Sequence, residues 1–336
     1  MKNSSINHIK DCVGIGIDVS KDSLSFAEIT EDKTYITNIE NSISSIDLVA
    51  QKLMQENYQG KVICESTGHY HLKIVSVFSK YKLNLLVLNP LQSSKHSKAN
   101  IRKVKSDPAD AETLGIMCIT EKNLPKPTEL SDSKILIRLK MGQLASLEKF
   151  IQRLQSSVNA YHETYEGLKF KESDVQRDLA ETLSKLKKTK GRMTRELERL
   201  ISDLCVDDHV INDIQEIPGV SEITAALISQ FDTDVKDANS WVAYVGYDVS
   251  VRQSGKWKGR GKLTKRGNSY LRKRLWGAAW GAMRHDEHFK AYYDQLRGNG
   301  RSYVAALCIL AKKILRIAYQ IMVNHKKYDP NIAFPA

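Results

Sequence analysis

Four carboxylates occupy positions at which a protein can gather metal ligands. Asp18 follows the apolar run Val13-Gly14-Ile15-Gly16-Ile17, and Glu65 ends the shorter run Lys61-Val62-Ile63-Cys64. Both runs are short and rich in β-branched residues, which is typical of a buried strand rather than a helix. Burying an unpaired charge is costly, so each acid must emerge at the end of its strand, find a partner or bind a cation.

Two further acids, Asp107 and Asp110, lie at the start of a predicted helix. Residues three apart share one helix face, so both carboxylates can point at a common ion. Helix capping would explain the same pattern, because Asp107 is a good N-cap, Pro108 suits the first helical position and an acid at the third favours the helix dipole. When these two residues are considered without the other acids, helix capping and metal binding explain them equally well.

Taken together, the four acids predict a divalent metal site. Four oxygen-rich ligands on a mixed sheet can hold two Mg²⁺ ions, which prefer carboxylates and water. Paired metals stabilise the attacking and leaving oxygens of phosphodiester transfer. The order and placement of Asp18, Glu65, Asp107 and Asp110 resemble a ribonuclease-H-like nuclease core of the RuvC type.

Hydrophobic patterning predicts the elements that position these acids. The first 90 residues show the order strand, strand, strand, helix, strand, helix, strand, with strands at 12–20, 24–29, 35–39, 61–65 and 85–88. Ser44 or Ser45 is expected to cap the first helix. This order predicts an α/β domain with a mixed sheet and helices on its faces.

The middle of the chain has a helical pattern. Apolar residues from Leu144 to Leu168 alternate spacings of three and four, and a second run from Met193 to Leu204 does the same. This pattern predicts a long antiparallel hairpin or coiled coil, within one chain or between two. A mostly helical region should follow, whose segment 304–323 carries three cations and is amphipathic rather than membrane-spanning. We expect domains at 1–130, 131–206 and 207–336.

A basic segment lies in the last third of the 336-residue chain, whose net charge is +12. Ten Lys or Arg and no acid occur from Arg252 to Arg274, with glycines between them that let a phosphate chain approach the backbone. A solvated basic loop is the alternative, but the charge density and the possible stacking surface of Trp257 favour nucleic acid. The expected contacts are Lys105, Arg252, Lys256, Trp257, Lys258, Arg260, Lys262, Lys265, Arg266 and Arg272.

Five motifs together resemble one protein family. They are Gly16-Ile17-Asp18-Val19-Ser20-Lys21, Glu65-Ser66-Thr67-Gly68, Lys105-Ser106-Asp107-Pro108-Ala109-Asp110-Ala111, Ile217-Pro218-Gly219-Val220, and Ser254-Gly255 followed by Lys265-Arg266-Gly267-Asn268-Ser269-Tyr270-Leu271-Arg272. In these motifs the chain is similar to the DEDD transposases of the insertion-sequence-110 type and to the related Piv DNA invertases. The resemblance implies that Asp18, Glu65, Asp107 and Asp110 form the metal-binding tetrad, with Mg²⁺ or Mn²⁺, and that Ser254 is a nucleophile.

The resemblance also implies the partners. Members of this family recombine DNA through a covalent serine–phosphate link, and several are guided by a structured RNA from the ends of their own element. We therefore expect donor and target DNA, a guide RNA and a homo-oligomer, dimeric or tetrameric. The scattered cysteines predict reduced thiols in a cytoplasmic protein, and the resemblance implies a bacterial protein that acts at the nucleoid. Ser250, four residues from Ser254, is the alternative nucleophile.

Three other functions stay open at this point. A metal-dependent, junction-resolving nuclease would use the same tetrad without a covalent serine. An actin-like or sugar-kinase ATPase also begins with a strand that bears Asp, but no second glycine-rich phosphate loop is evident and the basic segment would have no role. A non-catalytic nucleic-acid scaffold would use the acids as helix caps only.

Overall fold

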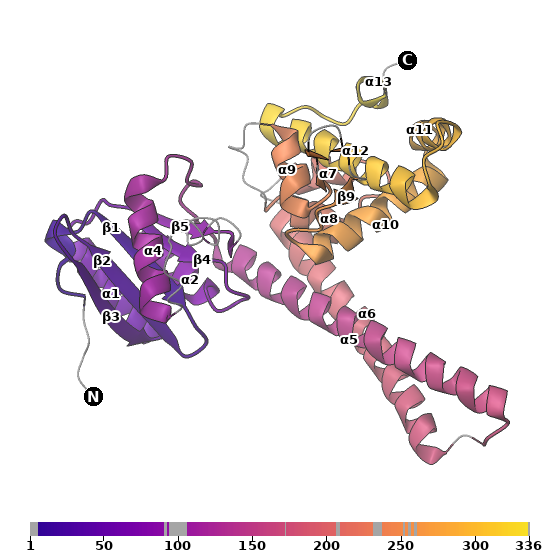
Figure 1. The fold of residues 1–336 in the computed structure, drawn as a ribbon, viewed down its shortest axis with the longest axis horizontal. Helices are drawn as coiled ribbons and strands as arrows, with labels where there is room; N and C mark the ends of the chain where they lie inside the picture. Colours follow the sequence, from indigo (N-terminus) through magenta and orange to yellow (C-terminus); the bar gives the residue numbers. More distant parts are fainter. Residues whose placement is uncertain are drawn as a thin grey trace. The chain divides into compact units, whose positions relative to one another are not determined.

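The computed structural model describes residues 6–90, 93, 106–171, 173–205, 209–230, 237–250, 253–254, 257–258 and 261–334. For residues 205, 253–254 and 257–258 it describes the backbone alone. The chain divides into two compact units, residues 1–142 and residues 143–336. Figure 1 colours them along the sequence from indigo to yellow.

A five-stranded sheet forms the centre of the N-terminal unit. Its strands are β1 (Gly14–Val19), β2 (Ser23–Ile29), β3 (Thr34–Glu40), β4 (Val62–Glu65) and β5 (Leu85–Leu88), in the order β3-β2-β1-β4-β5. The β1 strand runs antiparallel to β2 and parallel to β4, while β3 and β5 continue the antiparallel and parallel halves. The predicted mixed sheet is confirmed.

Successive residues of β1 point to opposite faces of this sheet, so they show what covers each face. Ile15 and Ile17 point into the main core, together with buried residues of α1 (Ile43–Gln55) and α2 (Leu72–Lys80). Gly14 and Gly16 face the opposite side, where α4 (Asp107–Thr120) crosses the sheet. Figure 1 shows α4 lying across the strands.

The β1 strand and the α4 helix meet backbone to backbone. A Cβ atom at Gly16 would lie 2.0 Å from the carbonyl oxygen of Ala111 and 2.2 Å from the amide nitrogen of Gly115. A Cβ atom at Gly115 would in turn lie 2.6 Å from Cγ1 of Ile29. Glycine inside a strand often marks such a close approach by another backbone. The missing side chains therefore set how near α4 comes to the sheet.

The first helix begins earlier than the sequence suggested. Its N-cap is Ser42, whose hydroxyl accepts a hydrogen bond from the amide of Ser45 at 3.3 Å. The expected cap at Ser44 or Ser45 is wrong. Ser42 has the extended backbone that an N-cap needs, whereas the other two serines already belong to the first helical turn.

Two long helices, α5 (Asp132–Leu168) and α6 (Asp174–Cys205), form the predicted hairpin (Figure 1). The Lys187 ammonium of α6 donates a hydrogen bond to the Gln155 side chain of α5. The buried apolar residues of the two helices within the C-terminal unit are Leu144, Ile151, Leu183, Leu197 and Ile201. This part of the heptad pattern therefore packs within one chain. Side chains toward the hairpin tip are exposed, among them Tyr161, Leu168, Phe170, Val175 and Leu179.

The rest of the C-terminal unit is mostly helical, as predicted. Its helices are α7 (His209–Gln215), α8 (Glu222–Ile228), α9 (Ala238–Val245), α10 (Ser269–His285), α11 (Glu287–Gly298), α12 (Tyr303–Asn324) and α13 (Pro330–Ala333). The buried α12 packs against α9, where the rings of Trp241 and Tyr319 meet edge to face at 5.2 Å. Within the described residues, no helix combines the length and the apolar character that crossing a membrane requires.

We expect Gly16→Ala to lower the free energy of unfolding by about 3 kcal/mol or more. The new methyl group would overlap the α4 backbone, and overpacking that forces backbone shifts typically costs ~1–3 kcal/mol even in softer surroundings. Gly142→Ala on α5 is the matched control, because nothing lies within 4 Å of its added Cβ. That control should gain roughly 0.5–1 kcal/mol from helix propensity. Circular dichroism melts measure both variants, and a Gly16→Ala protein as stable as wild type would refute the close approach of the two backbones.

Candidate metal centre

Asp18 and Glu65 lie at the carboxyl ends of neighbouring parallel strands. Strands β1 and β4 pair Gly16 with Ile63 and Ile17 with Cys64. One residue further along each strand brings Asp18 beside Glu65, on the same face as Gly16 because alternate residues share a face. Both acids therefore emerge on the face that α4 covers.

The α4 helix supplies Asp107 and Asp110 in its first turn. Ala111 and Leu114, each one turn further along from one of these acids, are buried. Residues four apart lie above one another on a helix, so the two acids belong to the face turned toward the sheet. The helix begins at Asp107 itself, and its N-cap position is Ser106, whose side chain makes no capping hydrogen bond. Asp107 is therefore not the N-cap that the capping interpretation required.

The four carboxylates come within electrostatic reach of one another. The pKa of Asp18 is raised from 3.8 to about 6, first by burial and then by the negative charges of Asp107, Asp110 and Glu65. Like charges disfavour the ionised form of a carboxyl group. The structure thus places all four predicted acids where β1 and β4 end and α4 begins, near enough for the charges of the other three to act on Asp18.

This donor set fits a hard divalent cation. All the donors are carboxylate oxygens, and a bound cation would relieve the repulsion that raises the pKa of Asp18. The side chains do not yet form a closed ligand shell: among the described residues, no three His, Cys, Asp or Glu side chains are gathered closely enough to hold an ion. Metal binding would therefore require the carboxylates to move closer together.

Hydrogen bonds hold the loops that follow the acid-bearing strands. The Asn41 side chain donates to the carbonyl of Ser20 at 2.8 Å, and Lys73 donates to the carbonyl of Asn41 at 2.6 Å. His71, six residues after Glu65, is buried, and burial lowers its pKa to about 4. This histidine is therefore neutral at pH 7 and adds no positive charge to the loop. Sequence reasoning missed these residues, because nothing in their spacing marks them.

Two short antiparallel strand pairs lie in the basic segment and just before it. The β6 strand (Val249–Ser250) pairs with β9 (Lys262–Leu263), and β7 (Gln253–Ser254) pairs with β8 (Trp257–Lys258). Ser254 stands opposite Trp257 in this ladder. The Ser250 hydroxyl donates a hydrogen bond to the carbonyl of Lys262 at 3.0 Å, so it is engaged between its two strands. The predicted contacts outside the described residues are Lys105, Arg252, Lys256 and Arg260.

The described cations of this segment differ in their surroundings. Lys262, Lys265 and Arg266 are exposed to solvent. Arg272 instead donates to the carbonyl of Val245 at 2.6 Å and to that of Arg266 at 3.4 Å. Its guanidinium therefore fastens the basic segment to the end of α9.

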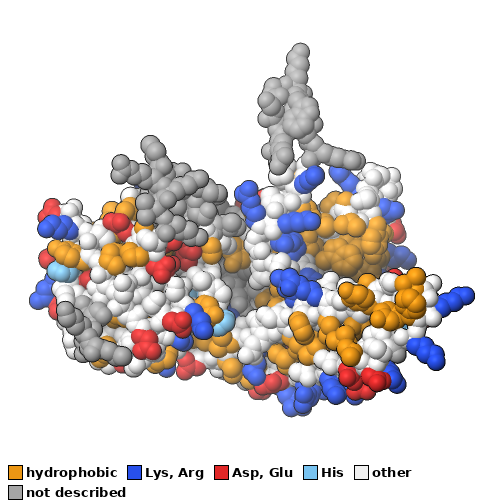
Figure 2. Space-filling view, turned by 60° about the horizontal axis from the view of Figure 1, so that its bottom comes forward, with side chains coloured by type: hydrophobic (Ala, Val, Ile, Leu, Met, Phe, Trp, Pro, Cys, Tyr) orange, Lys and Arg blue, Asp and Glu red, His pale blue; other side chains and the backbone are white. Residues whose placement is uncertain are grey.

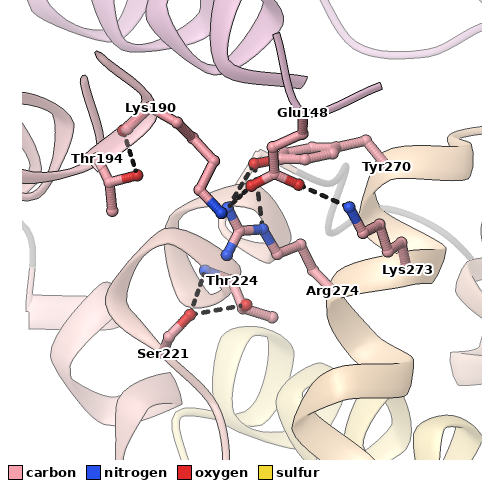
Figure 3. A network of polar contacts seen from close by, with 8 residues as sticks. All are labelled: Glu148, Lys190, Thr194, Ser221, Thr224, Tyr270, Lys273 and Arg274. Atoms are coloured by element: carbon pink, nitrogen blue, oxygen red, sulfur yellow. Dashed lines mark hydrogen bonds and ion pairs between the residues drawn. The ribbon is translucent and has the colours of Figure 1, made fainter. Parts of the chain in front are cut away.

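Glu148 of α5 binds the next two cations of α10. It accepts hydrogen bonds from Lys273 at 2.8 Å and from Arg274 at 3.0 Å, and Arg274 also donates to the Tyr270 hydroxyl at 2.6 Å (Figure 3). The Glu148 side chain is only 11% exposed, so water weakens these ion pairs less than it would at the surface. The start of α10 is thereby held against α5.

We expect Asp18→Asn to remove a pH-dependent loss of stability from the metal-free protein. The pKa of Asp18 in the folded chain, about 6, exceeds its ordinary value of 3.8. The folded state therefore binds more protons than the unfolded state between these values, and the free energy of unfolding falls as the pH rises through them. In EDTA, the Tm of wild type relative to Asp18→Asn should drop by about 1–2 °C between pH 4 and pH 7, as expected for ~1 kcal/mol in a chain of 336 residues. A difference in Tm that stays constant with pH would show that the carboxylates do not repel one another.

Two family models match the chain. One, described as a transposase and built on the DEDD transposases of IS110, matches residues 15–163, which include all four acids. The other, described as the transposase IS116/IS110/IS902 family, matches residues 212–294, which include Ser254 and the basic segment. A search of curated proteins gave no match. Its mixed sheet and the α4 helix carry the four acids, and a long helical hairpin and a helical C-terminal region follow. The chain belongs to the IS110 family of DEDD transposases, enzymes that act on DNA.

Proposed function

We propose that this transposase cuts and rejoins DNA strands with a metal-bound tetrad, Asp18, Glu65, Asp107 and Asp110, and with Ser254 as its nucleophile. The observation that carries the proposal is the position of Asp107, Asp110 and Glu65 around Asp18, whose pKa is raised first by burial and then by their negative charges. A DEDD transposase depends on divalent metal. We assign Mg²⁺ or Mn²⁺ to this site because its donors are all carboxylate oxygens.

The protein contributes position and charge to the tetrad. The ends of β1 and β4 hold Asp18 and Glu65 side by side, while the first turn of α4 places Asp107 and Asp110 over them. When bound, a divalent metal supplies Lewis-acid stabilisation for the charge that develops on phosphodiester oxygens. The tetrad keeps four negative side chains together, and their combined charge would attract the cation.

Ser254 would carry the covalent step. Its Oγ attacks the phosphorus of a DNA phosphodiester; the new O–P bond forms as the bond to one deoxyribose oxygen breaks, and that oxygen takes up a proton. The serine proton passes to solvent. A DNA hydroxyl then attacks the phosphoserine and releases the enzyme, so each step replaces one phosphate ester by another. The exposed Lys262, Lys265 and Arg266 lie in the same segment and would stabilise the extra negative charge.

Two features favour Ser254 over Ser250 as the nucleophile. The hydroxyl of Ser250 is already engaged with the carbonyl of Lys262. Ser254 lies in the Ser254-Gly255 motif that resembles the family pattern. An aliphatic hydroxyl is a weak nucleophile and needs activation, which in this proposal depends on the tetrad. The tetrad and Ser254 must therefore act on one phosphate, within one chain or between two copies.

We also propose that the active form is a homo-oligomer and that a structured RNA guides it to DNA. Several large apolar side chains at the hairpin tip are exposed, which supports the oligomer because exposed apolar patches mark interaction sites. Figure 2 shows hydrophobic side chains on the surface of the C-terminal unit among Lys and Arg. The net charge of +12 supports a polyanionic guide in addition to the DNA.

A triple substitution at the hairpin tip tests the assembly. Leu168→Ser, Phe170→Ser and Val175→Ser together should lower the mass in light scattering toward the 38.0 kDa of one chain. These side chains are 58–67% exposed, so their loss should leave the Tm nearly unchanged. Ile43→Ser, Leu48→Ser and Met54→Ser on α1, 51–64% exposed, form the matched control. An unchanged mass for the tip variant, or an equal fall for both variants, would rule out the tip as the interface.

Trapping the DNA adduct tests the serine. Wild type is incubated with a nicked suicide substrate and the metal, digested with protease, and the modified peptide is located by mass spectrometry. Ser254→Ala should lose about 10³-fold or more in recombination, and the Ser254→Ala, Asp18→Asn double variant should be no worse, since groups that act as a unit are not additive. Ser250→Ala is the matched control and should still form the adduct.

Two outcomes would contradict this proposal. An adduct on Ser250 would move the nucleophile by four residues. Full recombination by Ser254→Ala, with no adduct on any residue, would favour the metal-dependent, junction-resolving nuclease instead.

A further inference from the structure

The middle of α6 is strongly basic. Residues 182–195 contain six Lys or Arg and no Asp or Glu, far from the basic segment in the sequence. Two of these cations lie on the side of α6 turned toward α5. Lys187 donates to Gln155 of α5, and Lys190 lies beside the Glu148 network that Figure 3 shows. The other four are Lys185, Lys188, Arg192 and Arg195.

These four cations form one stripe, which we call the α6 stripe. Their spacings of three, four and three residues place them on one helix face. All four are exposed. The buried Leu183 marks the side of α6 that packs against α5, and its heptad pattern continues along that side. Each cation of the stripe follows a position of this pattern by two residues, which is roughly half a turn of the helix. The stripe therefore runs along the side of α6 turned away from α5. With a rise of 1.5 Å per residue, the stripe is about 15 Å long.

The surface between the cations is hollowed. Lys185, Lys188, Arg192 and Arg195 line a shallow depression of about 530 Å³, with Thr189 and Gly191 between them. A Cβ atom at Gly191 would meet nothing nearer than the Arg195 guanidinium at 3.9 Å, so a ligand can approach the helix backbone there. The α6 helix thus presents four long cationic side chains around a depression whose base is formed by the small residues Thr189 and Gly191.

Two acids flank the stripe, Glu181 before it and Glu196 after it. Lys185 forms a long ion pair with Glu181 at 3.9 Å, but both side chains are at least 70% exposed, and such pairs contribute little. Like charges three or four residues apart destabilise a helix. A bound polyanion would remove that repulsion.

We propose that the α6 stripe binds the phosphate backbone of duplex DNA, as a binding surface separate from the tetrad and the basic segment. The successive cations lie about 5 Å apart along the helix, comparable to the one charge per 3.4 Å that each DNA strand presents along its axis. Lys and Arg without base-reading partners make sequence-independent contacts that position a duplex. DNA is the polyanion that this family acts on, so the stripe would hold DNA that flanks the reacting site. The inference does not depend on Ser254 or on metal.

The test measures the salt dependence of DNA binding by the full chain in EDTA, where no strand is cut. Fluorescence anisotropy follows a labelled 30-base-pair duplex of arbitrary sequence across a series of KCl concentrations. The variant carries Lys185→Gln, Lys188→Gln, Arg192→Gln and Arg195→Gln, because Gln keeps helix propensity and removes charge. The slope of log K against log [KCl] should fall by about 3 to 4, close to 0.9 for each phosphate that the variant no longer neutralises.

A matched control removes the same number of charges from the same unit. Lys290→Gln, Arg297→Gln, Lys326→Gln and Lys327→Gln alter four exposed cations elsewhere, and the slope should change by less than about 1. A second variant exchanges Lys and Arg at the four stripe positions and should bind like wild type. Circular dichroism confirms that each variant is folded.

The outcomes separate the possibilities. Equal losses for the stripe variant and the matched control would mean that net charge alone matters, and would overturn the proposal. A stripe variant that keeps its slope for DNA but loses it for a 30-nucleotide RNA would assign the stripe to RNA instead. Failure of the serine or metal proposal would leave this measurement unaffected, because neither takes part in it.

Discussion

The close approach of the β1 and α4 backbones is the constraint on which the acid site depends. Gly16 and Gly115 lack side chains where strand and helix cross, so the distance between these elements is set by main-chain atoms. Asp18 lies two residues beyond this crossing, and Asp107 and Asp110 lie one to two turns before it along α4. A bulkier residue at the crossing would lift the helix and take two of the four acids away from the other two.

Packing and electrostatics oppose each other at this site. The apolar faces of the sheet and of α4 pack together, while the carboxylates at their ends repel one another. Burial, and then this repulsion, raise the pKa of Asp18. Active sites commonly contain such unfavourable arrangements, which persist because the packing of the surrounding core stabilises them. In this unit the core includes buried residues from every strand except β3, and that core holds the acids in place.

Much of this architecture could be predicted from the sequence, because strand alternation and heptad spacing are periodic signals. The ends of β1 and β4, with Asp18 and Glu65, followed directly from them. Other features depend on tertiary contacts that no local pattern records. A glycine shows that a side chain is missing but not which backbone approaches, and Glu148 meets Lys273 across 125 residues of sequence. The strands β6 to β9 have two residues each, too few to show an alternation. Three neighbouring serines left the cap of α1 ambiguous.

Three cations at the start of α10 already have hydrogen-bond partners within the protein. Lys273 and Arg274 already donate hydrogen bonds to Glu148, and Arg272 donates to two carbonyl groups. An incoming anion at Lys273 would have to displace the carboxylate it already holds, so it would exchange one partner for another and gain little. Such residues form a fixed part of the scaffold, although the net charge counts each of them in the same way as an exposed surface lysine. Fewer Lys and Arg side chains are therefore available to a ligand than the 51 in the sequence suggest.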